Sequence, residues 1–156
     1  MNAVILTISD SRKPANDLSG VTLAGLLIEM HAVVVEKLII SDELDDIRNT
    51  LHVLTERDDV DVVITTGGTG LGPRDNTPEA TRAVIDREAP GIAEAMRRET
   101  SRDAPLAMLS RGICGSRNNT LIINLPGSPK AVEECFAVIR PVLEHAVQIL
   151  SGKTQH

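Results

Sequence analysis

Aromatic side chains are almost absent from this chain of 156 residues, which contains one Phe and neither Trp nor Tyr. Proteins that bind single-stranded nucleic acid stack the bases on aromatic rings, and this chain has no such platform. The net charge of −6 also argues against general binding to a phosphate backbone, although a small anionic ligand at a local site stays compatible with it. We therefore expect no nucleic-acid partner and a core of aliphatic side chains.

Long apolar runs and paired cysteines are absent as well. The sequence has no run of about 18 apolar residues, so we expect no membrane span. The first residues, MNAVILTISD, lack the basic start and the cleavage site of a signal peptide. Cys114 and Cys135 form no CxxC pair and have no histidine close by in the sequence, which favours buried thiols over a nucleophile. The simplest prediction is a reduced, cytoplasmic protein.

Aliphatic runs alternate with amphipathic segments along the whole chain. The length fits a single domain covering residues 1–156. Strands are predicted at 3–9, 32–40, 60–66, 106–115 and 119–127. Helices are predicted at 21–30, 41–57, 77–88, 91–100 and 128–150. This alternation predicts an α/β layer fold with a mostly parallel sheet, in which ligands bind beyond the carboxyl ends of the strands.

A glycine-rich stretch, TTGGTGLGPRDNTPEA at residues 65–80, follows one of the predicted strands. It contains Gly67, Gly68, Gly70 and Gly72. Glycines allow positive φ angles and let backbone N–H groups converge on an anion. A tight turn alone would need one or two glycines, so four of them favour a ligand-binding loop. The spacing matches neither a Walker A loop nor a Rossmann fingerprint.

A second loop, NLPGSPKA, follows the last predicted strand and contains Pro126 and Gly127. Ser128 is a good N-cap for the next helix, and the N–H groups at such a helix start bind anions. Lys130 adds a positive charge. Plain capping is the more common explanation of such a loop by itself. Two loops of this kind at one sheet edge favour a ligand that carries phosphate.

Two acids, Asp42 and Asp75, lie at predicted carboxyl ends of strands. Each is a candidate ligand for Mg²⁺, which prefers carboxylates together with phosphate oxygens. Helix capping is the alternative for Asp42, and its own segment favours capping. Asp75 is more suggestive because it precedes Thr77, which we expect to be the cap of helix 77–88.

Polar residues at other predicted strand ends are candidates for binding an anionic group. Ser110 and Arg111 lie in LSRG, and Ser9 and Asp10 lie in ISDSR after the first strand. Ordinary turn polarity explains both groups equally well. The four histidines lie outside all these loops, which argues against a histidine base or a metal site made of histidines.

In their order and spacing, the motifs TTGGTG, RDNTPEA, LSRG and NLPGSPKA resemble the molybdenum-cofactor biosynthesis domain of the Mog/MoaB type. The same domain occurs as the G domain of gephyrin and of plant Cnx proteins. The resemblance runs from Val4 to Leu150, nearly the whole chain. It implies a three-layer α/β/α sandwich with a mostly parallel central sheet that binds molybdopterin, an anionic pterin dithiolene.

Active members of this family are molybdopterin adenylyltransferases, which use Mg²⁺ to join AMP from ATP to the pterin phosphate and release pyrophosphate. The resemblance implies that Asp42 and Asp75 are the two essential acids and hold the metal, which reverses the preference for capping at Asp42. It also implies substrate-binding roles for Thr66, Gly67, Gly68, Thr69, Gly70, Ser110, Pro126, Gly127 and Ser128.

Two other functions are compatible with the same resemblance. One is a catalytically silent molybdopterin-binding scaffold of the MoaB type. The other is a hydrolase of nucleotide derivatives, because a similar domain occurs in competence-damage-type proteins. The chain keeps both acids, which favours catalysis. The family resemblance further implies a homo-oligomer, a trimer or a hexamer, and contact with other enzymes of the molybdenum cofactor pathway.

Overall fold

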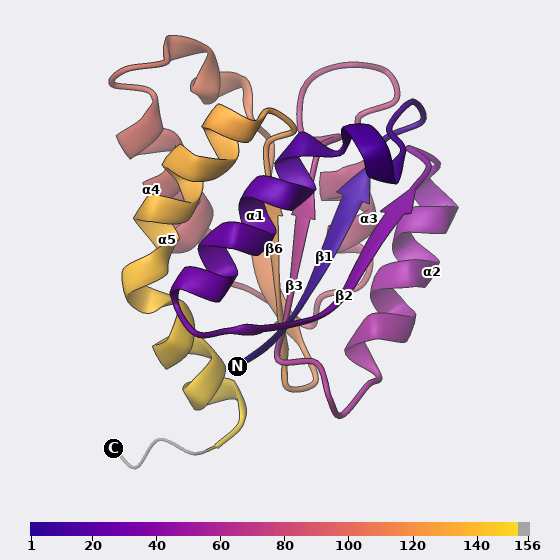
Figure 1. Ribbon diagram of the computed structural model, residues 1–156, viewed down its shortest axis with the longest axis vertical. Helices are drawn as coiled ribbons and strands as arrows, with labels where there is room; N and C mark the ends of the chain where they lie inside the picture. Colours follow the sequence, from indigo (N-terminus) through magenta and orange to yellow (C-terminus); the bar gives the residue numbers. More distant parts are fainter. Residues whose placement is uncertain (153–156) are drawn as a thin grey trace.

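The computed structural model describes residues 1–152, and a six-stranded sheet forms their centre (Figure 1). The strand order is β2-β1-β3-β6-β5-β4. The strands are β1 (Asn2–Ile8), β2 (Val33–Ile40), β3 (Val62–Thr66), β4 (Arg87–Glu88), β5 (Cys114–Arg117) and β6 (Thr120–Leu125). β1, β2, β3 and β6 pair in parallel, whereas β5 and β4 add antiparallel pairs at one side. The predicted, mostly parallel sheet is confirmed. Residues 153–156 of the predicted domain lie outside the described residues.

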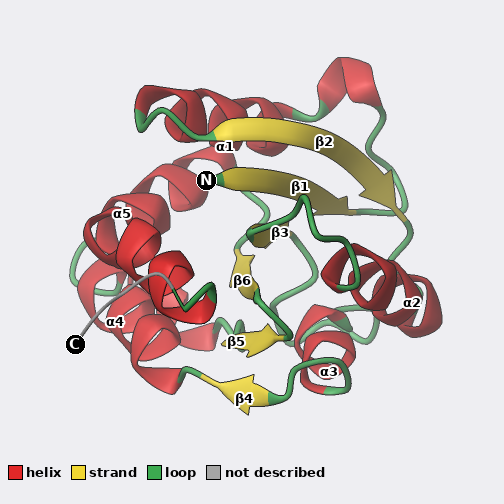
Figure 2. Ribbon diagram, turned by 90° about the horizontal axis from the view of Figure 1, so that it is seen from below, coloured by secondary structure: helices red, strands yellow, loops and turns green. Residues whose placement is uncertain are grey.

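Helices cover both faces of this sheet (Figure 2). One face carries α1 (Leu18–Glu29), α4 (Pro90–Thr100) and α5 (Pro129–Leu150), and the other carries α2 (Leu44–Thr55) and α3 (Thr77–Arg82). Two short 3-10 helices are η1 (Pro14–Asn16) and η2 (Pro105–Leu109). The expected three-layer α/β/α sandwich is confirmed. None of the helices within residues 1–152 combines the length and hydrophobicity needed to cross a bilayer.

The core consists of two aliphatic clusters, one on each face of the sheet. Successive strand residues point to opposite faces, so Ile5 packs in the cluster under α1 and α5 while Val4 packs in the cluster under α2. Phe136, the single aromatic residue, is buried on α5. Both cysteines are buried, and burial raises the pKa of Cys114 to about 12 and that of Cys135 to about 11. Such thiols stay protonated and unreactive near neutral pH.

The predicted strand at 106–115 is wrong over its first part. Residues 105–109 form η2 instead, and β5 begins only at Cys114. The apolar run suggested a buried strand, but Leu106 and Met108 are 78% and 67% exposed. Pro105 lies at the first position of η2, where proline suits a helical start. This segment differs from the strands in being exposed, and the apolar sequence alone does not show that difference.

The predicted helix at 77–88 is too long. α3 ends at Arg82, and Arg87–Glu88 form β4. The backbone N–H groups of Asp86 and Ala89 donate to carbonyls of Ser116 and Cys114, each at 2.8 Å. Pairing with β5 therefore replaces the hydrogen bonds that further helical turns would have made.

Candidate active site

The loops that follow the parallel strands meet at one edge of the sheet, the upper edge in Figure 1. Asp10 follows β1, Asp42 follows β2, the glycine-rich stretch follows β3, and Pro126 follows β6. Parallel strands all end at the same edge of a sheet, so the alternation of strands and helices brings these loops together. The sequence prediction that these loops lie together is confirmed.

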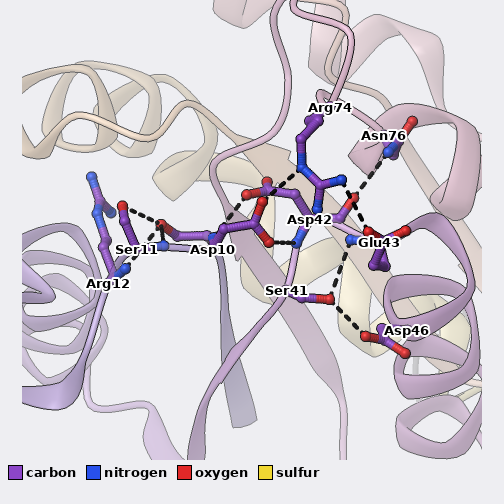
Figure 3. Close-up of polar contacts among 10 residues, drawn as sticks. Asp10, Ser11, Arg12, Ser41, Asp42, Glu43, Asp46, Arg74 and Asn76 are labelled. Carbon is purple, nitrogen blue, oxygen red and sulfur yellow. Dashed lines mark hydrogen bonds and ion pairs between the residues drawn. The ribbon is translucent and has the colours of Figure 1, made fainter.

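Asp10 and Asp42 hold each other by a reciprocal pair of hydrogen bonds (Figure 3). The backbone N–H of Asp10 donates to Asp42 Oδ2 at 2.8 Å, and the backbone N–H of Asp42 donates to Asp10 Oδ1 at 3.0 Å. The side-chain amide of Asn76 also donates to the carbonyl of Asp42 at 2.9 Å. Each of these bonds runs from a side chain of one loop to the backbone of another, and together they join the loops after β1, β2 and β3.

Asp42 does not cap a helix. The N-cap position of α2 belongs to Glu43, and no side chain accepts a capping bond there. Because the Asp42 carboxylate points to the Asp10 N–H instead, the capping interpretation of this segment is wrong. The predicted cap at Thr77 is also wrong, because Asn76 occupies the N-cap position of α3.

The electrostatics of the two carboxyl groups differ. Partial burial is the largest cause that raises the pKa of Asp42, and the negative charges of Asp10 and Asp75 raise it further, against the hydrogen bond from the Asp10 N–H and the charge of Arg74. A hydrogen bond from Arg74 holds the pKa of Asp10 below its ordinary range. Asp42 therefore carries its charge at a cost that a cation at this edge would relieve.

Arg74 is a residue of this edge that the sequence analysis missed. Its Nε donates to Asp10 Oδ2 at 2.7 Å, and its guanidinium also donates to Glu43 Oε1 at 2.9 Å (Figure 3). The signal was present, because Arg74 directly precedes Asp75 in the motif RDNTPEA. The sequence alone did not show that it faces carboxylates from two other loops.

Asp75 folds back on the glycine-rich stretch. The N–H of Gly72 donates to Asp75 Oδ2 at 2.8 Å, and the N–H of Asp75 donates to the carbonyl of Gly72 at 3.0 Å. A Cβ at Gly70 or at Gly72 would come within 2.9 Å or 2.8 Å of the same carboxylate oxygen. These glycines therefore make room for an acid of the site.

Gly67 and Gly68 meet requirements of the backbone itself. Their φ angles are 98° and 64°, in the left-handed region that favours glycine. A Cβ on Gly67 would lie 2.5 Å from the carbonyl oxygen of Ile8, and one on Gly68 would lie 2.4 Å from Thr77 Oγ1. Thr77 Oγ1 in turn donates to the carbonyl of Gly67 at 2.9 Å. Packing therefore explains part of the glycine content that the sequence attributed to a ligand.

Free donors lie in the middle of this loop. Within residues 1–152, the N–H groups of Gly68, Thr69 and Gly70 donate to no other group of the chain, whereas that of Gly67 donates to the Leu125 carbonyl. Gly127 packs beside Gly67, because a Cβ there would lie 3.3 Å from its Cα. The two loops predicted to favour a phosphate-bearing ligand are thus in contact.

The start of α5 has the predicted cap. Ser128 Oγ accepts from the N–H of Ala131 at 3.2 Å, and Pro129 follows it at the first helical position. Lys130 is 80% exposed at its side chain and lies 3.6 Å from Glu134. The positive charge of Lys130 therefore lies close to the start of α5, but the Glu134 carboxylate offsets part of it.

Arg111 braces the glycine-rich stretch from the opposite side. Its Nε donates to the Gly70 carbonyl and its Nη2 to the Asp75 carbonyl, both at 2.6 Å, and it also pairs with the Glu79 carboxylate. The N–H of Arg111 donates to the Thr69 carbonyl at 2.8 Å. These internal partners occupy most of the donors of Arg111. Its contact with substrate stays a prediction.

The loop after β1 is tied to the rest of the edge by polar side chains. Ser9 Oγ accepts from the N–H of Arg12 at 3.2 Å. The Arg12 guanidinium donates to Ser19 Oγ and to the Gly127 carbonyl. Ser19 Oγ lies 3.1 Å from Thr66 Oγ1, and both side chains are buried. Thr66 therefore stabilises the end of β3, and Arg12 is a second residue that sequence reasoning missed.

A cavity of about 310 Å³ opens beside the glycine-rich stretch. Its lining is mostly apolar and includes Thr69, Gly70, Ser110 and Pro126, which the sequence analysis assigned to substrate. This size falls in the range of small-molecule sites, which combine apolar walls with a few polar groups. η2, which the sequence analysis took for a strand, supplies part of the wall.

The carboxylates at this edge fit a magnesium site that is completed by phosphate and water, and they do not form a site enclosed by protein ligands. Within residues 1–152, no group of three or more acidic, histidine or cysteine residues lies close enough to hold a metal ion. Asp42 and Asp75 each engage one carboxylate oxygen with a backbone N–H, which leaves the other oxygen for a cation. Mg²⁺ is commonly bound through one or two carboxylates together with phosphates and water.

Comparison with known families decides the family of the chain. The model described as "Probable molybdopterin binding domain" matches residues 4–145. The chain belongs to this family. The resemblance in the motifs is thereby confirmed, and with it a place in molybdenum cofactor biosynthesis.

Relatives of this chain include enzymes that it matches over most of their length and longer proteins that it matches in part. The molybdopterin adenylyltransferase of Helicobacter pylori J99 is 39% identical over 95% of this chain and 86% of its own length. The molybdenum cofactor synthesis protein cinnamon of Drosophila melanogaster is 45% identical over 94% of this chain, which spans only 25% of that protein. The molybdopterin biosynthesis enzyme MoaB of Thermus thermophilus superposes with a TM-score of 0.89, at 41% identity and 99% coverage of both chains.

Proposed function

We propose that this protein is a molybdopterin adenylyltransferase, which transfers AMP from ATP to the phosphate of molybdopterin and releases pyrophosphate. One observation carries the proposal: two acids from separate loops, Asp42 and Asp75, face the same sheet edge beside a loop with free N–H donors. The relative from Helicobacter pylori, 39% identical over nearly the whole chain, bears the name of this activity.

In the proposed reaction, an oxygen of the pterin phosphate attacks the α-phosphorus of ATP. The bond from this phosphorus to the oxygen that bridges it to the β-phosphorus breaks, and that oxygen leaves with the pyrophosphate. No covalent intermediate with the protein is required. Catalysis then depends on alignment of the two phosphates and on stabilisation of their negative charge.

The chain supplies both requirements. The N–H groups of Gly68, Thr69 and Gly70, together with the start of α5, would hold phosphate oxygens. Asp42 and Asp75 would hold Mg²⁺, which neutralises charge on the triphosphate when bound. The cavity between this loop and η2 would take the pterin ring, because it is mostly apolar and opens next to the same loop.

The proposal includes a homo-oligomer, a trimer or a hexamer, that works in the cytoplasm with other enzymes of the molybdenum cofactor pathway. The homo-oligomer is supported by the outer face of α1, where Leu18, Val21 and Ile28 are 64%, 56% and 62% exposed. A helix that is apolar on its outer as well as its inner face is typically covered by a partner.

The test is to incubate the purified protein with molybdopterin, ATP and Mg²⁺ and to detect adenylylated pterin by mass spectrometry and pyrophosphate by a coupled assay. We expect both products, and neither in the presence of EDTA. Pterin binding without product would indicate the silent scaffold instead. Hydrolysis of ATP without pterin would indicate the hydrolase.

A further inference from the structure

The Arg74 guanidinium lies among the carboxylates at the carboxyl edge of the sheet, where a metal ion would also lie. It bridges Asp10 and Glu43, which follow two different strands, at 2.7 Å and 2.9 Å. Asp42, whose N–H donates to the same Asp10 carboxylate, lies in this group, and Asp75 directly follows Arg74 in the chain. One guanidinium thus offsets several negative charges that otherwise repel each other.

A divalent ion bound by Asp42 and Asp75 would take over this role. Arg74 and Asp42 bind the same Asp10 carboxylate, Arg74 through Nε at Oδ2 and Asp42 through its backbone N–H at Oδ1, so a cation on Asp42 would lie close to the guanidinium. Two positive groups at one edge repel each other, so a metal ion on Asp42 and Asp75 would weaken the hold of Arg74 on Asp10 and Glu43.

The surroundings of Arg74 allow it to leave. Its side chain is 53% exposed, and residues 71–74 of the loop are all exposed. Guanidinium binds phosphate through two parallel hydrogen bonds and is less strongly hydrated than an ammonium group. A triphosphate held over the neighbouring N–H groups of Gly68, Thr69 and Gly70 would lie beside the same loop.

We propose that Arg74 is an exchangeable counter-ion of the active site: it neutralises Asp10 and Glu43 in the free protein, and it moves onto the triphosphate when Mg²⁺ and ATP bind. The inference rests on the proposed function, and it adds a residue that senses the nucleotide. It also gives the 71–74 loop two positions, one against the acids and one over the phosphates.

The test measures metal and nucleotide binding separately by calorimetry, first with MgCl₂ alone and then with ATP in excess Mg²⁺. For Arg74→Gln we expect Mg²⁺ alone to bind roughly 3- to 10-fold more tightly, because a competing charge is gone. We expect ATP to bind roughly 10-fold more weakly, with a matching increase in the KM for ATP. These opposite shifts are the signature of exchange.

Two further variants serve as controls. Arg74→Lys keeps the charge and loses the fork, so its Mg²⁺ affinity should stay near that of the wild type while ATP binding weakens. Arg57→Gln removes an arginine that also bridges two acids, Glu36 and Asp59, but follows α2 and precedes β3, away from the active-site edge. It should change neither affinity.

Unchanged affinities in Arg74→Gln, or a loss of both, would overturn the exchange, since a purely structural arginine produces no opposite shifts. If the wild type transfers AMP in that case, the proposed function stands and only the role of Arg74 fails. A wild type that binds neither Mg²⁺ nor ATP would overturn the proposed function, and the exchange with it.

Discussion

At the scale of single residues, Asp42 and Asp75 carry the proposed chemistry. We predict that Asp42→Asn and Asp75→Asn each slow adenylyl transfer by roughly a hundred- to a thousand-fold, because a metal-holding carboxylate stabilises the transition state more than the bound pterin. Single-turnover assays with saturating molybdopterin give this rate, and pterin affinity should change little.

A matched control for these variants is Asp59→Asn, which removes a carboxylate at the opposite end of the sheet. It should leave the rate unchanged. A normal rate in Asp42→Asn would assign Asp42 to holding the N–H of Asp10 only, because asparagine can still accept that bond.

The raised pKa of Asp42 gives a prediction about stability and pH. An acid whose pKa is higher in the folded protein than its ordinary value of 3.8 binds its proton more tightly when folded. At a pH below the pKa of the unfolded chain, Asp42 contributes its full stabilisation to the fold. This contribution is lost as the pH rises through the higher pKa of the folded protein. Asp42→Asn removes the effect, so its Tm should rise relative to the wild type between pH 4 and pH 7. A constant difference in Tm, followed by calorimetry, would contradict the raised pKa.

Gly68 is one of the two glycines of this loop whose backbone conformation leaves no room for a side chain. Gly68→Ala places a Cβ 2.4 Å from Thr77 Oγ1 at a φ of 64°. We predict a loss of roughly 2–4 kcal/mol in the free energy of unfolding by urea. Gly91→Ala is the control: no further atom of residues 1–152 lies within 4 Å of its Cβ, and alanine near the start of α4 should not lower the free energy of unfolding. A neutral Gly68→Ala would show that the loop yields without cost.

At the scale of elements, Arg111 joins the segment before β5 to the loop between β3 and α3. We predict that Arg111→Lys lowers the free energy of unfolding by roughly 1–3 kcal/mol, because lysine cannot reach Gly70, Asp75 and Glu79 together. Activity should fall with it, since Asp75 loses its support.

Urea unfolding and pterin titration together distinguish the two roles of Arg111. Weaker pterin binding at full stability would make it a substrate ligand and no brace. Arg102→Lys is the control and should change neither quantity, because the Arg102 side chain is 68% exposed and, within residues 1–152, pairs with Glu99 alone.

At the scale of the whole molecule, the exposed apolar face of α1 bears on assembly. We predict that light scattering at micromolar concentration gives a mass of three or six chains, each of 16.8 kDa. Oligomerisation would remove Leu18, Val21 and Ile28 from water. A mass of one chain at every concentration would refute this expectation.

The sequence by itself determined the layers and the edge. Continuous aliphatic runs predicted the strands and helical periodicity predicted the helices, and their alternation favours parallel strands whose carboxyl ends meet. Asp42, Asp75 and both loops could therefore be assigned to one place before any coordinates. The motifs also carried enough information to identify the family.

Only the tertiary structure decided what each polar group contacts. The bonds from Arg74 to Asp10 and from Arg111 to Gly70 join residues 64 and 41 positions apart, and no local pattern encodes such pairs. The sequence also did not show that η2 is exposed, and its hydrophobic residues therefore predicted a buried strand. Local patterns report which face of an element is buried, whereas the partners of a charge depend on how separate loops fold back over one edge.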